Sequence, residues 1–324
     1  MVPGGNLDAA ASGWRQALGA DRVTTTPDEF GRFGSSTLAQ AAVPAAVVRA
    51  VTADEVVAIV QVARENEVPL YPVSQGRNWG YGDACPVGPG QAVLDLSGMN
   101  RIIEVDPELA YAVIEPGVTQ GQLHAHLEHT GCGLISACTG SAPDASVVGN
   151  MIERGFGPKP YGEHAANACG LEVVLADGTL VKTGMAAYEG SATAHVYRWG
   201  LGPSLDGLFS QSNLGIVVKA GVWLMPKPAA MTTFSLELES DADLGRAIDQ
   251  LRRLRLQRTL TGPVYIANVF RTLAHMGRYP WHETNGDTPL SRELAEKLVR
   301  RRAQPGRGGR YNAIGALQRS TMLR

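Results

Sequence analysis

The chain is organised around one glycine-rich stretch, Pro72-Val73-Ser74-Gln75-Gly76-Arg77-Asn78-Trp79-Gly80-Tyr81-Gly82. It follows an apolar run, residues 68–71, that predicts a short buried strand. Three glycines within seven residues let the backbone approach a ligand closely, and successive amide N–H groups in such a loop form a concave anion site. Arg77 adds a positively charged fork suited to phosphate. The stretch therefore predicts a pyrophosphate-binding loop, with an ordinary glycine-rich turn as the alternative.

Neither common nucleotide motif accompanies this loop. The P-loop pattern is a glycine, four further residues and then Gly-Lys-Ser or Gly-Lys-Thr, and it does not occur here. Residues 131–136 begin like the G-x-G-x-x-G dinucleotide fingerprint but lack its third glycine. A nucleotide site in this chain would therefore belong to another architecture.

Composition limits the classes of protein that fit. The 324 residues suffice for two domains with their own cores, and 44% apolar with 19% charged residues is typical of a globular protein. A net charge of −2 gives the whole chain no electrostatic footprint for nucleic acid. The N-terminus has no basic-then-apolar signal pattern and no apolar run is long enough to span a membrane. We therefore expect no nucleic-acid or membrane partner and a cytoplasmic location.

Metal and disulfide chemistry is not predicted. The four cysteines lack C-x-x-C spacing, so free buried thiols are the expected state. His126 is two residues and His129 five residues after His124, so the three histidines do not share one helix face. The last quarter of the chain is basic, and its arginines are interpreted as a solvated helix face, with contact to an acidic partner or a neighbouring subunit as the alternative: Arg252, Arg253, Arg255, Arg258, Arg300, Arg301, Arg302, Arg307 and Arg310.

Local patterns predict an alternation of helices and strands up to residue 228. Thr52 with Glu55 forms a capping box that opens a helix over 52–66, which leads into the strand and the glycine loop as a β-α-β start. A second capping box, Thr119 with Gln122, opens a helix to about residue 129. Other patterns predict strands at 92–96, 102–105 and 111–114, a hairpin with an Asp-Gly turn over 171–181, and a strand from about 214 to 224.

A second small-residue segment, residues 139–150, suits a flat ligand lying against the backbone. Asp144 or Ser146 is expected to cap a following helix. The alternative is a loop that is packed tightly for steric reasons alone.

Pro226 and Pro228 predict a domain boundary. After it, the pattern predicts strands at 234–238, 264–270 and 311–317 and a helix over 243–257. Thr288-Pro289 is expected to open a further helix to about Arg302, with proline at the favoured first position. This order favours an α+β layer. The expected division is an N-terminal segment 1–42, a nucleotide-binding domain 43–228 and a further domain 229–324.

Five segments in order resemble the vanillyl-alcohol oxidase and 4-cresol dehydrogenase (p-cresol methylhydroxylase, PCMH) flavoproteins. They cover about 43–228, and the resemblance extends more weakly to the end of the chain: residues 74–82, 115–119, 146–155, 160–164 and 208–217. The resemblance implies an α+β fold with a PCMH-type FAD-binding domain of two α/β subdomains, followed by part of an α+β cap (substrate) domain. It also implies that the chain is C-terminally truncated.

The resemblance implies FAD as cofactor, with the pyrophosphate held by residues 74–78. The residues expected to contact FAD are Val73, Ser74, Gln75, Gly76, Arg77, Asn78, Trp79, Pro116, Gly140, Ser141, Ser146, Gly149, Asn150, Arg154, Gly155, Glu163, His164, Gly215, Ile216 and Val217. Tyr81 and Ser141 are the expected catalytic residues. Ser141 occupies the position where some oxidases of this family carry an aspartate near the reactive flavin edge, and Asp144 lies close by in sequence.

The implied reaction is hydride transfer from the benzylic carbon of a para-substituted phenol to FAD. Tyr81 matches a tyrosine that binds the phenolate, and such a donor lowers the pKa of the phenol by stabilising its anion. The sequence does not distinguish oxygen from cytochrome c as the electron acceptor. It is also compatible with a homo-oligomer and with a covalent or a non-covalent flavin. Two alternatives are a flavin-binding fragment without turnover and a related FAD enzyme of hydroxy acids or sugars. Tyr81 and residues 210–217 argue against the latter.

Overall fold

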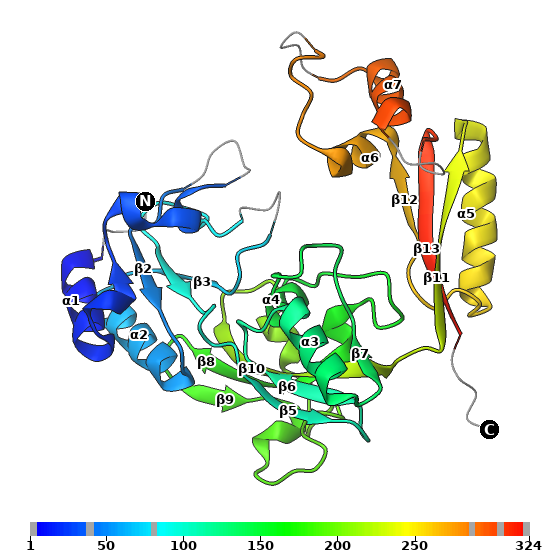
Figure 1. Cartoon of the computed structure of the whole chain (residues 1–324). Helices are drawn as coiled ribbons and strands as arrows, with labels where there is room; N and C mark the ends of the chain where they lie inside the picture. Colours follow the sequence, from blue (N-terminus) through cyan, green and yellow to red (C-terminus); the bar gives the residue numbers. More distant parts are fainter. Residues whose placement is uncertain (1–4, 37–41, 79–82, 285–288, 303–307, 320–324) are drawn as a thin grey trace. The chain divides into compact units, whose positions relative to one another are not determined.

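The computed structural model describes residues 5–36, 42–78, 83–284, 289–302 and 308–319. The chain divides into two compact units, Met1–Phe156 with Glu163–Pro226, and Gly157–Gly162 with Lys227–Arg324 (Figure 1). We call them the first and the second unit. The short segment 157–162 is grouped with the second unit although it lies within the sequence of the first. The three-part domain division drawn from the sequence stays a prediction.

A small, mostly parallel sheet begins the first unit. Its strand order is β1-β2-β4-β3, with β2 (Ala46–Arg49), β4 (Ala92–Asp95) and β3 (Leu70–Val73) parallel and β1 (Val23–Thr24) antiparallel to β2. Helix α2 (Ala53–Glu65) connects β2 to β3 and confirms the β-α-β start. Helix α1 (Leu7–Leu18) packs against α2. The glycine-rich loop leaves this sheet at the carboxyl end of β3.

Both faces of this sheet are buried, which explains its continuous apolar strands. Val48 and Leu94 lie in one core cluster with Trp14 and Ile59 of the helices. The strand residues that point to the other face, Val47, Val73 and Val93, pack with Phe30 and Phe33 in a second cluster. Val73, the last residue of β3, is therefore held by the cluster of Phe30 and Phe33.

A second, antiparallel sheet completes the first unit. Its order is β5 (Ile102–Asp106), β6 (Tyr111–Ile114), β10 (Gly215–Pro226), β8 (Ala168–Leu175) and β9 (Leu180–Lys182), and β7 (Leu134–Ser136) also pairs with β10. Helices α3 (Gln120–Thr130) and α4 (Val147–Ile152) bury leucine, valine and methionine side chains in its core. The Asp177-Gly178 turn of the predicted hairpin is confirmed between β8 and β9, with Gly178 at φ +88°.

The two predicted capping boxes form only in part. Thr52 and Thr119 accept hydrogen bonds from the backbone N–H groups of Glu55 and Gln122, at 3.2 and 3.0 Å. The return bonds go elsewhere. Glu55 accepts from the N–H of Val51 at 2.7 Å, and Gln122 donates to the carbonyl of Asn100 at 2.7 Å. Gln122 therefore ties its helix to the turn before β5 instead of to its own cap.

The second unit is an antiparallel three-stranded sheet with helices, as the expected α+β layer requires. The strand order is β11 (Ala230–Leu238), β13 (Tyr311–Arg319) and β12 (Tyr265–Asn268). The helices are α5 (Asp241–Leu256), α6 (Val269–Met276) and α7 (Arg292–Arg302). Short 3-10 turns elsewhere in the chain cover Ala20–Arg22, Pro27–Glu29, Gly31–Gly34, His164–Asn167, Gly184–Ala187 and Asp206–Phe209.

Several predicted boundaries in the second unit are wrong. The strand expected to begin at residue 234 begins at Ala230. The strand expected over 264–270 ends at Asn268, because the Asn268 side chain accepts from the N–H of Arg271 at 2.9 Å and starts α6. The helix expected from Pro289 begins at Arg292, and Ser291 accepts from the N–H of Leu294 at 3.2 Å. Thr288, which was expected to precede that helix, lies outside the described residues.

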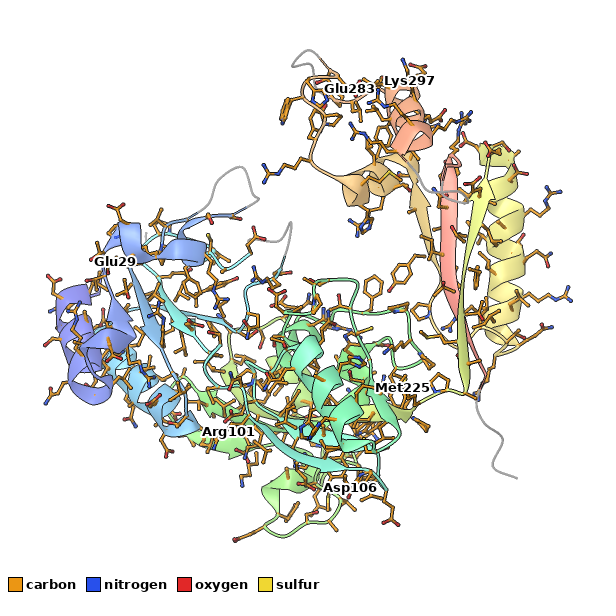
Figure 2. All side chains as sticks on the ribbon, in the orientation of Figure 1. Glu29, Arg101, Asp106, Met225, Glu283 and Lys297 are labelled. Carbon is orange, nitrogen blue, oxygen red and sulfur yellow. The ribbon has the colours of Figure 1, made fainter. Side chains whose placement is uncertain are left out.

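Several arginines of the second unit form ion pairs within that unit. Arg292 and Arg310 lie 3.5 and 3.4 Å from Asp241. Glu283, labelled in Figure 2, pairs with Arg301 and lies 3.7 Å from Arg302. These contacts favour the interpretation of the basic stretch as a solvated, internally paired surface. No helix in the described ranges has the length and apolar character needed to cross a membrane.

Candidate functional site

The glycine-rich loop turns sharply at Gly76, which has φ +64°. A Cβ at this position would lie 2.6 Å from the Cβ of Ala84, so only glycine fits both the backbone angle and the space. The loop is held from outside itself as well. Arg32 donates to the carbonyl of Gln75 at 2.9 Å, and the Gln75 side chain donates to the carbonyl of Gly117 at 2.7 Å. Trp79 and Tyr81 lie outside the described residues.

Arg32 is a supporting residue that the sequence did not indicate. Its guanidinium also contacts Asp95 at 3.3 Å, and Asp95 is buried at the end of β4 beside β3. The residue lies in a short 3-10 turn far from the loop in sequence, so no local pattern could have indicated it. The arginine holds loop carbonyls in place, and as a donor it does not compete with a ligand for the loop amides.

A second loop meets the first through Ser146. The Ser146 hydroxyl donates to the carbonyl of Pro116 at 2.6 Å and accepts from the N–H of Gly149 at 2.8 Å, so Ser146, and not Asp144, caps α4. A Cβ on Gly149 would lie 2.5 Å from Ser74 Oγ. The glycine loop, the Pro116 turn and the start of α4 are therefore in close contact.

The segment 139–145 is held by the first turn of α3. The Gln120 side chain donates to the carbonyl of Ala142 at 2.7 Å and accepts from the N–H of Thr139 at 3.1 Å, while the N–H of Gly121 donates to the carbonyl of Pro143 at 2.8 Å. Within this frame the hydroxyl of Ser141 is buried and has no partner in the described structure. The segment is therefore ordered by its neighbours and still presents an unpaired polar group.

Arg77 and Asp144 link the two loops by an ion pair, with 2.5 Å between Arg77 Nη2 and Asp144 Oδ2. Both side chains are partly exposed. The guanidinium that the sequence assigned to phosphate is thus oriented by a carboxylate of the neighbouring loop. The other oxygen of Asp144 is buried without a partner in the described structure.

Asn150 and His164 form the far side of the candidate site. The distance between Asn150 Oδ1 and His164 Nδ1 is 2.5 Å. A Cβ on Gly155 would collide with the Asn150 side chain, which explains the glycine there. Burial lowers the pKa of His164 to about 4, so its ring is uncharged at neutral pH.

The remaining predicted residues differ in what they offer to a ligand. Val73 and Val217 are buried in core clusters, and Ile216 packs against a core cluster, so only their backbones are available. Gly215 lies in β10 with Val173 close to its α-carbon. Arg154 has φ +52° directly after α4, in the turn that brings Gly155 onto Asn150. Gly140, Asn78 and Glu163 lie on loops beside the residues described above.

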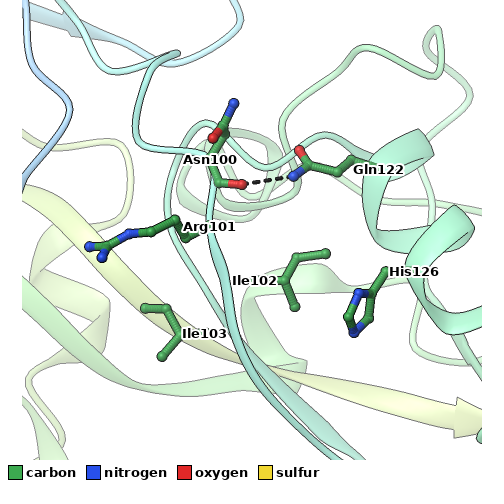
Figure 3. Close-up of a pocket in the computed structure, with 6 residues that line it drawn as sticks. All are labelled: Asn100, Arg101, Ile102, Ile103, Gln122 and His126. Atoms are coloured by element: carbon green, nitrogen blue, oxygen red, sulfur yellow. Dashed lines mark hydrogen bonds between the residues drawn. The ribbon is translucent and has the colours of Figure 1, made fainter. Parts of the chain in front are cut away.

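A separate pocket of about 560 Å³ lies at the start of β5 (Figure 3). Figure 3 shows His126 of α3 beside Ile102 at this pocket, together with the hydrogen bond from Gln122 to Asn100. No residue of the candidate site lines it. Across the described ranges, no group of three or more His, Cys, Asp or Glu is arranged to hold a metal ion.

The residues present fit a large, anionic, flat cofactor. Glycines at 76 and 149 allow close approach of backbone, and the unpaired atoms of Ser141, Asp144 and His164 lie on the segments that these contacts bring together. Loop amides and Arg77 suit a pyrophosphate, and the small residues suit a ring system. The site and the fold therefore fit a protein that binds a nucleotide cofactor with a flat ring system.

Comparisons with known proteins agree with this class. Residues 44–184 match the FAD binding domain family. The chain is 44% identical over 297 residues to the 1'-carboxy-chondrochloren decarboxylase of Chondromyces crocatus, an alignment that covers 91% of this chain and 54% of that protein. It is 39% identical over 295 residues to the 4-cresol dehydrogenase [hydroxylating] flavoprotein subunit of Pseudomonas putida, covering 90% and 57%.

The crystal structure of p-cresol methylhydroxylase with substrate bound superimposes with a TM-score of 0.88 at 36% identity, covering 97% of this chain and 61% of that one. The chain therefore contains an FAD-binding domain like that of the PCMH-type flavoproteins, and its cofactor is FAD. It spans little more than half the length of the two curated relatives.

Proposed function

We propose that this protein is an FAD-dependent oxidoreductase that removes a hydride from the benzylic carbon of a para-substituted phenol, as expected for a relative of 4-cresol dehydrogenase or vanillyl-alcohol oxidase. The observation that carries the proposal is the 39% identity to the 4-cresol dehydrogenase flavoprotein subunit across 90% of this chain. The convergence of the glycine loop, Ser146 and His164 in one unit supports it.

Each part of the site has a role in this proposal. FAD, when bound, supplies the hydride acceptor. The amides of residues 74–78 and the Arg77 guanidinium hold the pyrophosphate, and Asp144 orients Arg77. Ser141, on the segment framed by Gln120, has a buried hydroxyl without a partner in the described structure and would offer it to the flavin.

Tyr81 would bind the substrate oxygen. Its hydroxyl donates to the phenolate, which lowers the pKa of the phenol and makes the ring a better hydride donor. We expect Tyr81→Phe to lower turnover of a para-alkyl phenol by about 10²-fold, in the range for loss of one donor that stabilises an oxyanion. The FAD content should not change. Tyr197→Phe is the control, because Tyr197 is exposed and outside the site. Full turnover by Tyr81→Phe would refute this role.

The first experiment is the visible absorbance spectrum of the purified protein before and after acid precipitation. A flavin band shows the bound cofactor, and flavin in the supernatant shows that it is not covalently attached. Turnover is then measured with para-alkyl phenols and with 2-hydroxy acids, using oxygen or cytochrome c as acceptor. Turnover of the hydroxy acids alone would contradict the proposal. Flavin binding without turnover of any substrate would identify the 324-residue chain as a binding fragment.

A second candidate function is FAD-dependent decarboxylation. It is favoured by the 44% identity to a protein named as a decarboxylase. The two functions differ in their products, because decarboxylation releases carbon dioxide and simple benzylic oxidation does not. Para-substituted phenols with and without a side-chain carboxylate, assayed for carbon dioxide, would separate them.

A further inference from the structure

The Arg32 guanidinium holds two successive peptide groups of the glycine-rich loop. Its Nη1 donates to the carbonyl of Gln75 at 2.9 Å, and its Nη2 donates to the carbonyl of Ser74 at 3.4 Å. Both carbonyls therefore point to the side of the loop on which Arg32 lies.

The direction of each carbonyl also sets the direction of the amide that follows it. In a planar trans peptide group the C=O and the N–H point to opposite sides. The N–H groups of Gln75 and Gly76 belong to the two peptide groups that Arg32 holds, so they point away from Arg32. Neither N–H has a partner among the described residues, and Gly76 has φ +64°. Two adjacent, unpaired amides that face one way are suited to an anion.

Arg32 is itself fixed before any ligand arrives. The Asp95 side chain is 6% exposed, and its oxygens lie 3.3 Å from Arg32 Nη2 and 3.6 Å from Arg49 Nε. The N–H of Ser97 donates to the same carboxylate at 3.0 Å. The ring of Phe33 packs against Arg32, with 4.7 Å between its centroid and the central guanidinium carbon. This fixed support lowers the cost of ordering the loop when a ligand binds.

We propose that Arg32 is a positioning residue for the diphosphate of FAD, which turns the amides of Gln75 and Gly76 toward the ligand while Asp95 holds Arg32 in place. Arg32 acts on the loop carbonyls and does not itself contact the cofactor. The residue lies outside the matched FAD-binding region, residues 44–184. The inference rests on the proposed placement of the diphosphate at residues 74–78.

The test measures the FAD affinity of the FAD-free protein by quenching of flavin fluorescence. Arg32→Met keeps a long side chain but removes the donors, and it should weaken FAD binding about tenfold, the effect of one lost charge-assisted hydrogen bond. Equal affinity of Arg32→Met and the unaltered protein would overturn the role of Arg32 alone. Failure of the unaltered protein to bind FAD would refute the proposed site and this inference with it.

Arg49→Met is the matched control for charge. It removes a guanidinium that contacts the same Asp95 but no loop carbonyl in the part of the chain that the structure describes. It should change FAD affinity by less than about threefold, because a partly exposed charge is screened. An equal loss in both variants would show that positive charge near Asp95, and not the direction of the amides, matters, and would overturn the proposal.

The loss should also depend on the diphosphate. ADP shares this group with FAD and should show the same loss of about tenfold in Arg32→Met, whereas riboflavin has no phosphate and should bind the variant and the unaltered protein alike. Titrations followed by calorimetry or NMR give these affinities. An equal loss with riboflavin would indicate general damage to the site and would overturn the positioning role.

NMR of the unaltered protein gives a readout that does not depend on the folding of any variant. The amide proton signals of Gln75 and Gly76 should move to hydrogen-bonded values when ADP is added and should stay unchanged with adenosine. Unchanged signals at saturating ADP would contradict the proposal.

Discussion

Glu115 brings a negative charge into the interior of the first unit. Its side chain is 3% exposed, and its two oxygens accept from Arg101 through Nη2 at 2.7 Å, Nε at 3.1 Å and the backbone N–H at 2.8 Å. Arg101, labelled in Figure 2, stays largely exposed. The charge of Glu115 is therefore compensated by one partner that reaches it from the surface.

We predict that Glu115→Gln lowers the free energy of unfolding by about 1–3 kcal/mol, because the buried charge-assisted bonds to Arg101 are lost. Urea unfolding followed by circular dichroism measures the change. The matched control is Asp249→Asn, which removes a carboxylate 3.0 Å from Arg252 where both side chains are more than 60% exposed. That pair should contribute less than about 1 kcal/mol. Equal effects would show that burial does not decide the strength of these pairs.

Protonation of His164 makes the stability of the first unit depend on pH. Burial lowers its pKa from 6.5 to about 4, so the unfolded chain binds a proton at a higher pH than the folded chain does. The contribution of the neutral ring to stability is therefore complete above pH 6.5 and is lost as the pH falls to 4. We expect the free energy of unfolding to fall less between pH 7 and pH 4.5 in His164→Gln than in the unaltered protein, by about 1–3 kcal/mol. Urea unfolding of both proteins at pH 7 and pH 4.5 tests it, and parallel pH profiles would contradict the prediction.

Helix α4 contains a glycine, Gly149, at a position where alanine is expected to destabilise the protein despite its higher helix propensity. Alanine usually stabilises a helix relative to glycine by about 0.5–1 kcal/mol. At Gly149 the added Cβ would lie 2.5 Å from Ser74 Oγ. At Gly245 in α5 the Cβ would meet nothing within 4 Å. The same substitution therefore has different expected effects in the two helices.

We predict that Gly149→Ala destabilises the protein by about 1–3 kcal/mol through overpacking and also weakens FAD binding, because it separates α4 from the glycine loop. Gly245→Ala should stabilise it by about 0.5–1 kcal/mol and leave FAD affinity unchanged. Thermal unfolding and flavin fluorescence give both quantities. Stabilisation by Gly149→Ala would show that the loop adjusts freely to the helix.

At the scale of the whole molecule, the two units have separate cores. The first unit contains the clusters around Trp14 and around Leu123, and the second contains those around Leu298 and Leu251. A ligand that binds one folded unit stabilises that unit by mass action, by about 2.7 kcal/mol at a concentration of one hundred times Kd. FAD should therefore act on the first unit alone.

We predict that saturating FAD slows amide hydrogen exchange in the strands of the first unit, such as β4 and β10, and leaves exchange in β13 unchanged. Exchange of intact protein with and without FAD, read by mass spectrometry of peptides, tests this. ADP at the same occupancy serves as a control for the contacts of the adenosine diphosphate half of FAD. Protection of β13 equal to that of β4 would show that the units unfold together.

The sequence by itself determined the features that depend on local backbone chemistry. The N-caps at Thr52 and Thr119, the turn at Gly178 and the glycine-rich loop around Gly76 follow from short patterns, because each needs only a particular residue within a few positions. The family was evident for a similar reason, since five such patterns occur in order.

Only the tertiary structure decided which distant side chains meet. The support of Gln75 by Arg32, the pairing of Arg77 with Asp144 and the orientation of His164 by Asn150 join residues that are 14 to 67 positions apart. The same reason explains why Gln122 bonds to Asn100 and not to its own cap. Such contacts arise where packed elements bring their ends together, and no local pattern encodes a partner on another element.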